Sequence, residues 1–239
     1  MWTRRFCNFV LRILFRILLK LEIVGLENVP SEGPLILAMT HANFLDPALA
    51  GGVMPREVVM MSKAENFWHP ILGILVRLYG AFPVHRGEVD RQAICRSLEV
   101  LNSGEVLLMA PEGTRSGHGR LQKGHDGMTF IALRADAPIL PMAIMGGEHF
   151  WANLPKLRRT PIKIIIGNVF RFFPGQGRVR RAIISKMTEE AMYQLASLLP
   201  TERRGVYSDF ASATEDHLIF PPGSSSNLPK GGNRWPRPG

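Results

Sequence analysis

The hydrophobic positions of the chain follow two different periods, which predict two kinds of secondary structure. Short, continuous apolar runs bounded by turn residues are typical of buried strands. The range 21–34 predicts one strand followed by a turn. Further strands are predicted at 34–40, 56–62, 82–87, 105–111, 137–145 and 161–172. Apolar residues at helical spacing predict helices over 64–81, with a break near Pro70, and over 90–102, 126–136 and 179–199. Because strands alternate with helices, we expect an α/β fold whose mixed, largely parallel central sheet is flanked by helices.

The first 20 residues, MWTRRFCNFVLRILFRILLK, have the pattern of an amphipathic helix. At about 100° per residue, four basic residues fall within one sector of about 80°, and apolar residues cover much of the rest. These basic residues are Arg5, Arg12, Arg16 and Lys20. We expect the helix to lie in a membrane interface, with its cations toward lipid phosphates. The alternative is an amphipathic helix that packs on the protein's own core.

The same segment differs from two other kinds of N-terminal sequence. It lacks the roughly 18 uninterrupted apolar residues of a membrane-spanning helix. It also lacks a small-residue cleavage site, which argues against a removable signal peptide.

Composition narrows the range of partners. The chain has 239 residues, 46% of them hydrophobic, and a formal net charge of +9. Such a charge indicates an anionic partner, which could be nucleic acid, a membrane surface or a phosphorylated substrate. Aromatic residues are sparse and the basic residues dispersed, so we expect no nucleic-acid partner. The two cysteines, Cys7 and Cys95, offer neither a metal-binding spacing nor a disulfide framework, which favours a reducing compartment.

The stretch THANFLDP places His41 and Asp46 directly after an apolar strand. A neutral imidazole can accept a proton near pH 7, and a carboxylate on its other nitrogen would orient the ring. Pro47 predicts the first turn of a helix that runs to Val53, with Asp46 as its N-cap. The alternative is that Asp46 only caps this helix and His41 is an ordinary residue at the end of a strand. No G-x-S-x-G motif is present, so a base here would activate a hydroxyl of the substrate.

A second candidate is the glycine-rich stretch APEGTRSGHGR, which follows the strand at 105–111. Backbone amides of such a turn, the guanidinium of Arg115 and the hydroxyls of Thr114 and Ser116 suit a phosphate. Glu112 does not suit a phosphate, and we expect it to orient Arg115 or a neighbouring amide. The alternative is a solvated turn. The Walker pattern is absent, which disfavours a nucleotide-hydrolysing loop.

Arg86, at the end of the strand in FPVHRG, could supply a second cation to the same anion, although a solvated arginine is the alternative. His41, Arg86 and the loop at 112–124 all follow predicted strands. Functional groups of parallel sheets gather at the carboxyl ends of the strands, so we expect these residues to form one site.

Four blocks, taken in order, carry a family resemblance: H-x4-D in THANFLDP, then FPVHRG, PEGTRS and APILPMAI. Over roughly residues 20 to 200 the chain resembles the glycerolipid acyltransferase family, and within it most closely the bacterial 1-acyl-glycerol-3-phosphate acyltransferases. The later LQKGHDG is similar to the family's FKKG segment, with Leu121 and Gln122 in place of Phe-Lys. His85 occupies a place that is often acidic.

The resemblance implies a reaction. His41, oriented by Asp46, would deprotonate the free hydroxyl of a lysophospholipid, whose oxygen would attack the thioester of acyl-CoA or acyl-carrier protein. The residues implied to bind the acceptor and its phosphate are Arg86, Glu112, Gly113, Thr114, Arg115, Ser116 and Lys123. The resemblance implies no metal and no cofactor beyond this acyl thioester cosubstrate. It also implies a protein on the cytoplasmic face of the cell membrane, in contact with membrane lipids.

We therefore expect an amphipathic membrane-associating helix at 1–20, an acyltransferase domain at 21–200 and a C-terminal extension at 201–239. The extension is rich in Gly, Pro and Ser, which predicts disorder after about residue 219.

Two alternatives to this function stay open. The acceptor could be glycerol 3-phosphate, another lysophospholipid or a lyso-ornithine lipid, which a panel of acceptors would distinguish. The chain could instead be a non-catalytic peripheral protein that binds anionic lipid, which would leave His41 and Asp46 without a role.

Overall fold

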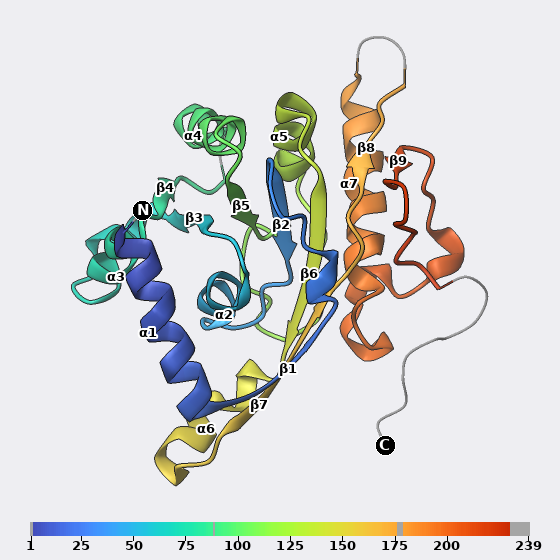
Figure 1. The fold of residues 1–239 in the computed structure, drawn as a ribbon. Coiled ribbons are helices and arrows are strands. Elements are labelled where there is room, and N and C mark those ends of the chain that lie inside the picture. Colours follow the sequence, from blue (N-terminus) through green and yellow to red (C-terminus); the bar gives the residue numbers. More distant parts are fainter. Residues whose placement is uncertain (1, 88, 176–178, 230–239) are drawn as a thin grey trace.

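The centre of the molecule is a seven-stranded sheet with helices on both faces (Figure 1). The computed structural model describes residues 2–87, 89–175 and 179–229. The strands are β1 (Leu19–Val24), β2 (Leu35–Met39), β3 (Val58–Lys63), β4 (Phe82–Val84), β5 (Val106–Met109), β6 (Ile139–Met145) and β7 (Thr160–Ile166). Their order across the sheet is β1-β7-β6-β2-β5-β3-β4. Among the strands of the described residues, only β6 and β7 pair antiparallel within this sheet, which confirms the predicted mixed, largely parallel α/β fold.

The helices form two layers because alternate residues of each strand point to opposite faces. The α-helices are α1 (Trp2–Leu18), α2 (Asp46–Val53), α3 (Leu72–Tyr79), α4 (Arg91–Asn102), α5 (Gly127–Ala135), α6 (Phe150–Asn153) and α7 (Arg181–Ala196). On β2, Leu35 and Leu37 pack in one core cluster with Leu49 of α2. Ile36 packs on the other face with Ile131 of α5. Figure 1 shows α1 and α2 on the first face, and α4, α5 and α7 on the second.

Two predicted elements are divided in the structure. The segment 64–81 consists of a 3-10 helix, η2 (Ala64–Trp68), and α3, with the break near Pro70 as expected. The single strand predicted at 161–172 was wrong, because the chain leaves β7 at Gly167 and resumes as the short strand β8 (Arg171–Phe172). A Cβ atom at Gly167 would lie 2.9 Å from the Cγ of Pro141, so the chain passes this point too closely for a side chain.

The C-terminal extension packs on α7. The strand β9 (Leu218–Ile219) pairs with β8. The carboxylate of Glu190, buried on α7, accepts hydrogen bonds from the hydroxyl of Thr214 at 2.8 Å and the amide of His217 at 3.0 Å. The composition predicted disorder after about residue 219, whereas residues 220–229 make defined contacts. The amide of Asn227, for example, donates to Gln194 Oε1 at 2.8 Å. Residues 230–239 lie outside the described residues.

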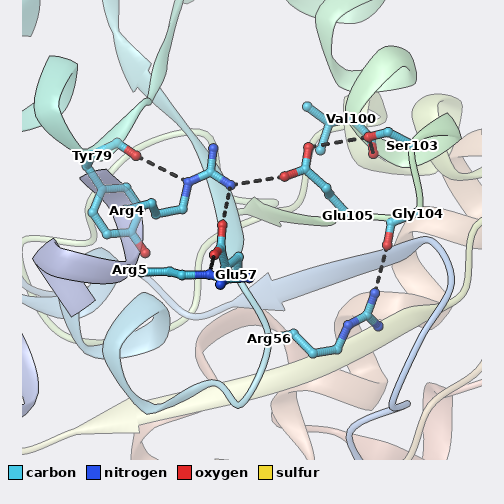
Figure 2. Close-up of polar contacts among 9 residues, drawn as sticks. All are labelled: Arg4, Arg5, Arg56, Glu57, Tyr79, Val100, Ser103, Gly104 and Glu105. Carbon is cyan, nitrogen blue, oxygen red and sulfur yellow. Dashed lines mark hydrogen bonds and ion pairs between the residues drawn. The ribbon is translucent and has the colours of Figure 1, made fainter. Parts of the chain in front are cut away.

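Helix α1 is fixed to the protein body through Arg4 (Figure 2). The Nε of Arg4 donates to the carbonyl of Tyr79, which ends α3, at 3.3 Å, and its Nη1 bonds Glu105 Oε1 at 3.1 Å. The same Nη1 lies 3.7 Å from Glu57 Oε2. Phe15 is buried against the sheet. The inner face of α1 therefore packs on the protein's own core, while its other face is exposed.

The four basic residues predicted to share one sector of a helix do not all lie on α1, because Lys20 belongs to β1. Arg5 pairs with Glu57 at 2.6 Å, and Arg12 donates to the carbonyls of Gly52 and Met54. All four of these residues are exposed, and their contact with lipid phosphates stays a prediction.

Among the described residues, no helix combines the length and the apolar character needed to cross a membrane.

Arg4 allows a direct test of how α1 is held. We expect Arg4→Met to lower the free energy of unfolding by about 2 kcal/mol, because two partly buried carboxylates lose their shared cation. The matched control is Arg5→Met. The Arg5 side chain is 71% exposed and that of Arg4 only 13%, so the control should change stability by less than about 0.5 kcal/mol. Urea denaturation measures both, and equal effects would show that Arg4 is not the anchor.

Candidate active site

His41 lies just beyond β2, at the carboxyl edge of the sheet. The preceding residue, Thr40, is held to β6: its amide donates to the carbonyl of Met142, and its hydroxyl accepts from the amide of Ile144 at 3.0 Å. His41 is buried. The strand therefore delivers the imidazole to a fixed position at the edge where β5 also ends.

Asp46 faces His41 from the start of α2. A single oxygen, Oδ2, accepts from the amides of Ala42 at 2.8 Å and Asn43 at 2.6 Å. The Nδ1 of His41 lies 3.4 Å from the same oxygen, which is long for a hydrogen bond. Such contacts often shorten when substrate binds. The buried carboxylate thus holds the turn that carries the imidazole and also faces its Nδ1.

The predicted N-cap role of Asp46 was wrong. Leu45 occupies the N-cap position without a side-chain hydrogen bond, and Asp46 is the first residue of α2, with Pro47 in the first turn. Its carboxylate turns back to the amides of the preceding turn. The negative charge still benefits from its position at a helix N-terminus.

Glu112 joins the two loops of the site. Its Oε1 accepts from the amide of His41 at 3.1 Å, and its Oε2 accepts from the amide of Gln122 at 2.9 Å. The side chain is almost fully buried, with 2% of the residue exposed. Burial raises the pKa of Glu112 to about 7, and the nearby carboxylate of Asp46 adds to this rise. A second contact, from the amide of Ser116 to the carbonyl of His41 at 2.8 Å, completes the junction.

The predicted phosphate loop presents only part of its side chains outward. Gly113, Thr114, Arg115 and Lys123 are exposed, whereas Glu112 and Ser116 are buried. Gly113 has φ +68°, and a Cβ there would lie 3.0 Å from the Cδ2 of His125. Ser116 and Glu112 instead line a cavity of about 10 Å³ below His41, which has room for about one water molecule. These two residues are buried and support the site from within, and their contact with the acceptor stays a prediction.

Arg86, exposed beyond β4, lies close enough to Arg115 for the two charges to interact. Partial burial lowers the pKa of Arg86, and the positive charge of Arg115 lowers it further. Two guanidinium groups that repel each other form a favourable place for an anion. Among the residues that the structure describes, no group of three His, Cys, Asp or Glu side chains could hold a metal ion.

The structure contains a second His–Asp pair that the sequence reading overlooked. His85 and Asp90 repeat the H-x4-D spacing, and Asp90 Oδ2 lies 2.9 Å from both the amide and the Nδ1 of His85. Asp90 also caps α4 through the amide of Ala93. Hydrogen bonds from Ala93 and His85 lower the pKa of Asp90 to about 2. The His85 side chain is 58% exposed, so this pair lies at the surface and not in a buried site.

The C-terminal extension also supports the site loop. The amide of Leu121 donates to the carbonyl of Arg203 at 2.9 Å, and the amide of Gly124 donates to the hydroxyl of Tyr207 at 3.0 Å. Sequence reasoning missed both contacts. The first joins two backbone groups and leaves no motif, and the second is made by a side chain 83 residues away along the chain.

Comparison with known proteins places this chain beside acyltransferases. The family model described as Acyltransferase matches residues 20–145. A 1-acyl-sn-glycerol-3-phosphate acyltransferase of Bacillus subtilis is 27% identical over 164 residues, which cover 68% of this chain and 80% of that protein. A protein of the same name from Pseudomonas aeruginosa is 27% identical over 208 residues, which cover 84% and 77%. The chain spans only 44% of a chloroplastic relative from Brassica napus, to which it is 31% identical over 154 residues.

A solved structure shows the same fold. The 1-acyl-sn-glycerophosphate acyltransferase from Thermotoga maritima superposes with a TM-score of 0.57 at 23% identity. The match covers 79% of this chain and 74% of that one.

The position of Glu112 predicts a pH dependence of stability. The unfolded chain releases this proton near pH 4.5, the folded chain near 7. Between these values the unfolded state binds fewer protons, so the free energy of unfolding falls as pH rises, by up to about 3 kcal/mol. We expect Glu112→Gln to remove this slope in urea denaturation from pH 4.5 to 7.5. The exposed control Glu99→Gln should retain it; an unchanged slope in Glu112→Gln would contradict the assignment.

Proposed function

We propose that this chain, which belongs to the acyltransferase family, transfers a fatty acyl group from an acyl thioester to the free hydroxyl of 1-acyl-glycerol-3-phosphate and so forms phosphatidic acid. The names of the relatives from Bacillus subtilis and Pseudomonas aeruginosa support this acceptor. The observation that carries the proposal is the buried pair of His41 and Asp46 beside the loop of Arg115. The amide of Ser116 and the carboxylate of Glu112 bind that loop directly to the backbone of His41.

His41 acts as the general base in this proposal. Its Nε2 takes the proton of the acceptor hydroxyl while the hydroxyl oxygen attacks the carbonyl carbon of the thioester. The resulting tetrahedral intermediate collapses, the carbon–sulfur bond breaks, and the leaving thiolate takes the proton from the imidazolium. The products are the new ester and a free thiol. Asp46, on the Nδ1 side, stabilises the positive imidazolium while it exists.

Arg115 and Arg86 bind the phosphate of the acceptor. Their mutual repulsion is relieved when a dianion lies between them, and guanidinium groups suit phosphate oxygens in geometry as well as charge. Exposed Thr114, Gly113 and Lys123 are available at the same loop as further contacts. The donor is acyl-CoA or acyl-carrier protein. The exposed apolar face of α1 holds the enzyme on the cytoplasmic face of the cell membrane, where its acceptor lies.

Removal of the base tests the proposed chemistry. Purified protein given lysophosphatidic acid and acyl-CoA should release CoA, and His41→Ala should lower kcat by about 10²- to 10⁴-fold, because no other group accepts the proton. His85→Ala is the matched control, since it disrupts the exposed pair with the same spacing, and it should keep most of the wild-type kcat. If the wild-type and His41→Ala proteins release CoA equally slowly, the proposed function is wrong.

The phosphate contact can be tested by the choice of acceptor. We expect Arg115→Gln to lower kcat/KM for lysophosphatidic acid by about 10- to 100-fold, the loss of a charge-assisted contact. The activity toward monoacylglycerol, which has no phosphate, should hardly change. A panel with glycerol 3-phosphate, other lysophospholipids and a lyso-ornithine lipid identifies the preferred acceptor. Equal losses for acceptors with and without phosphate would contradict the role of Arg115.

A further inference from the structure

Helix α3 turns its apolar side away from the protein. Four aliphatic residues at its start and along its length follow the i, i+3, i+4, i+7 spacing, yet they are 49–69% exposed. They are Ile71, Ile74, Leu75 and Leu78. The inner side carries Gly73, where a Cβ would lie 2.5 Å from the carbonyl oxygen of Phe67. In a soluble protein such a stripe normally faces the core, so this surface requires a partner.

The stripe of α3 continues onto α1. The two helices are in contact, and Arg4 of α1 fixes this arrangement through the carbonyl of Tyr79 at the end of α3 (Figures 1 and 2). Helix α1 has its own exposed apolar residues, which are Trp2, Phe6, Phe9, Val10, Ile13, Leu14 and Ile17. Trp68, which ends η2 just before α3, is also exposed. We call these exposed residues of the neighbouring elements α1, η2 and α3 the two-helix face.

Positive charge borders the two-helix face. A groove of about 390 Å³ lies beside α1, with Phe15 and Leu21 among its apolar lining and Arg12, Arg16 and Arg159 as its cations. Arg12 and Arg159 are each held in place by backbone carbonyls of the protein. An apolar surface next to fixed guanidinium groups matches the acyl chains and phosphates of an anionic bilayer.

We propose that the two-helix face docks on a bilayer that contains anionic lipid, and that α3 enters the lipid beside α1 as a second inserted element. The inference rests on the proposed function in one respect, because an acceptor held in a bilayer requires the enzyme at its surface. A second copy of the chain fits the face less well, since two chains that each carry a formal net charge of +9 repel each other.

The first experiment measures binding to vesicles by sedimentation, with phosphatidylcholine alone or mixed with phosphatidylglycerol. The full-length double variant Ile74→Ser/Leu75→Ser leaves α1 intact and should bind the mixed vesicles at least about tenfold more weakly. The matched control is Phe173→Ser, which removes an exposed apolar residue next to β8, on the opposite face of the sheet (Figure 1). It should bind like the wild type, and thermal melting should show that both variants are folded.

The second experiment asks whether α3 itself meets the acyl chains. One variant keeps Trp68 and has Phe at the three other tryptophan positions; a second has no native tryptophan and carries Phe173→Trp. Vesicles with brominated acyl chains should quench Trp68 and shift its emission to shorter wavelength, and should leave the tryptophan at 173 unchanged. Unquenched Trp68 in a vesicle-bound protein would overturn the proposal, even if α1 alone binds.

Two further outcomes separate the alternatives. If the double serine variant abolishes self-association in analytical ultracentrifugation but binds vesicles like the wild type, the face is a protein interface and the proposal is wrong. If vesicle binding and quenching behave as expected but no acceptor is acylated, the proposed function fails while the membrane-docking inference stands.

Discussion

The site depends on one buried carboxylate, that of Glu112, between the loops that follow β2 and β5. Each of its oxygens accepts a backbone amide, one from His41 and one from Gln122. A buried carboxylate without such partners would be costly, so the two loops need each other to satisfy this group. The imidazole belongs to one loop and Arg115 to the other. Through these backbone hydrogen bonds, Glu112 keeps the loop of the proposed base and the loop of the proposed phosphate contact in a constant relation.

Helix α2 connects this junction to the surface that carries α1. Its first residue is Asp46, which faces His41. At its other end, the guanidinium of Arg12 on α1 donates hydrogen bonds to the carbonyls of Gly52 and Met54. A carboxylate at the start of a helix and a guanidinium at its end both interact favourably with the helix dipole. The short helix is thus fixed at both ends, and the exposed face of α1 has a definite orientation relative to His41.

The sequence was sufficient to predict features that follow from local patterns. It was not sufficient for features that follow from contacts between segments far apart in the chain. The periodicity of the apolar residues was enough to predict the sheet, and the ends of the strands indicated where His41, Arg86 and the 112–124 loop would meet. The side-chain directions of Glu112 and Ser116 could not be predicted. Side chains alternate between the two faces of a sheet only within a strand, and these residues lie in the loop beyond it. The contacts of residues 220–229 were missed for a related reason. Asn227 is held by the side chain of Gln194, and the amino-acid composition of a segment does not reveal such single polar contacts.

The two His–Asp pairs show why the motif alone does not define a base. His85 and Asp90 have the same spacing and a shorter contact, 2.9 Å against 3.4 Å for His41 and Asp46. The motif and the contact distance alone would therefore favour His85 and Asp90 or accept both pairs. The difference lies in the surroundings: His85 is mostly exposed, whereas His41 is buried and is bound through its backbone to the loop of Arg115. In an exposed pair water competes for the proton and screens the carboxylate, so burial beside the proposed anion site, and not the spacing, favours His41 as the proposed base.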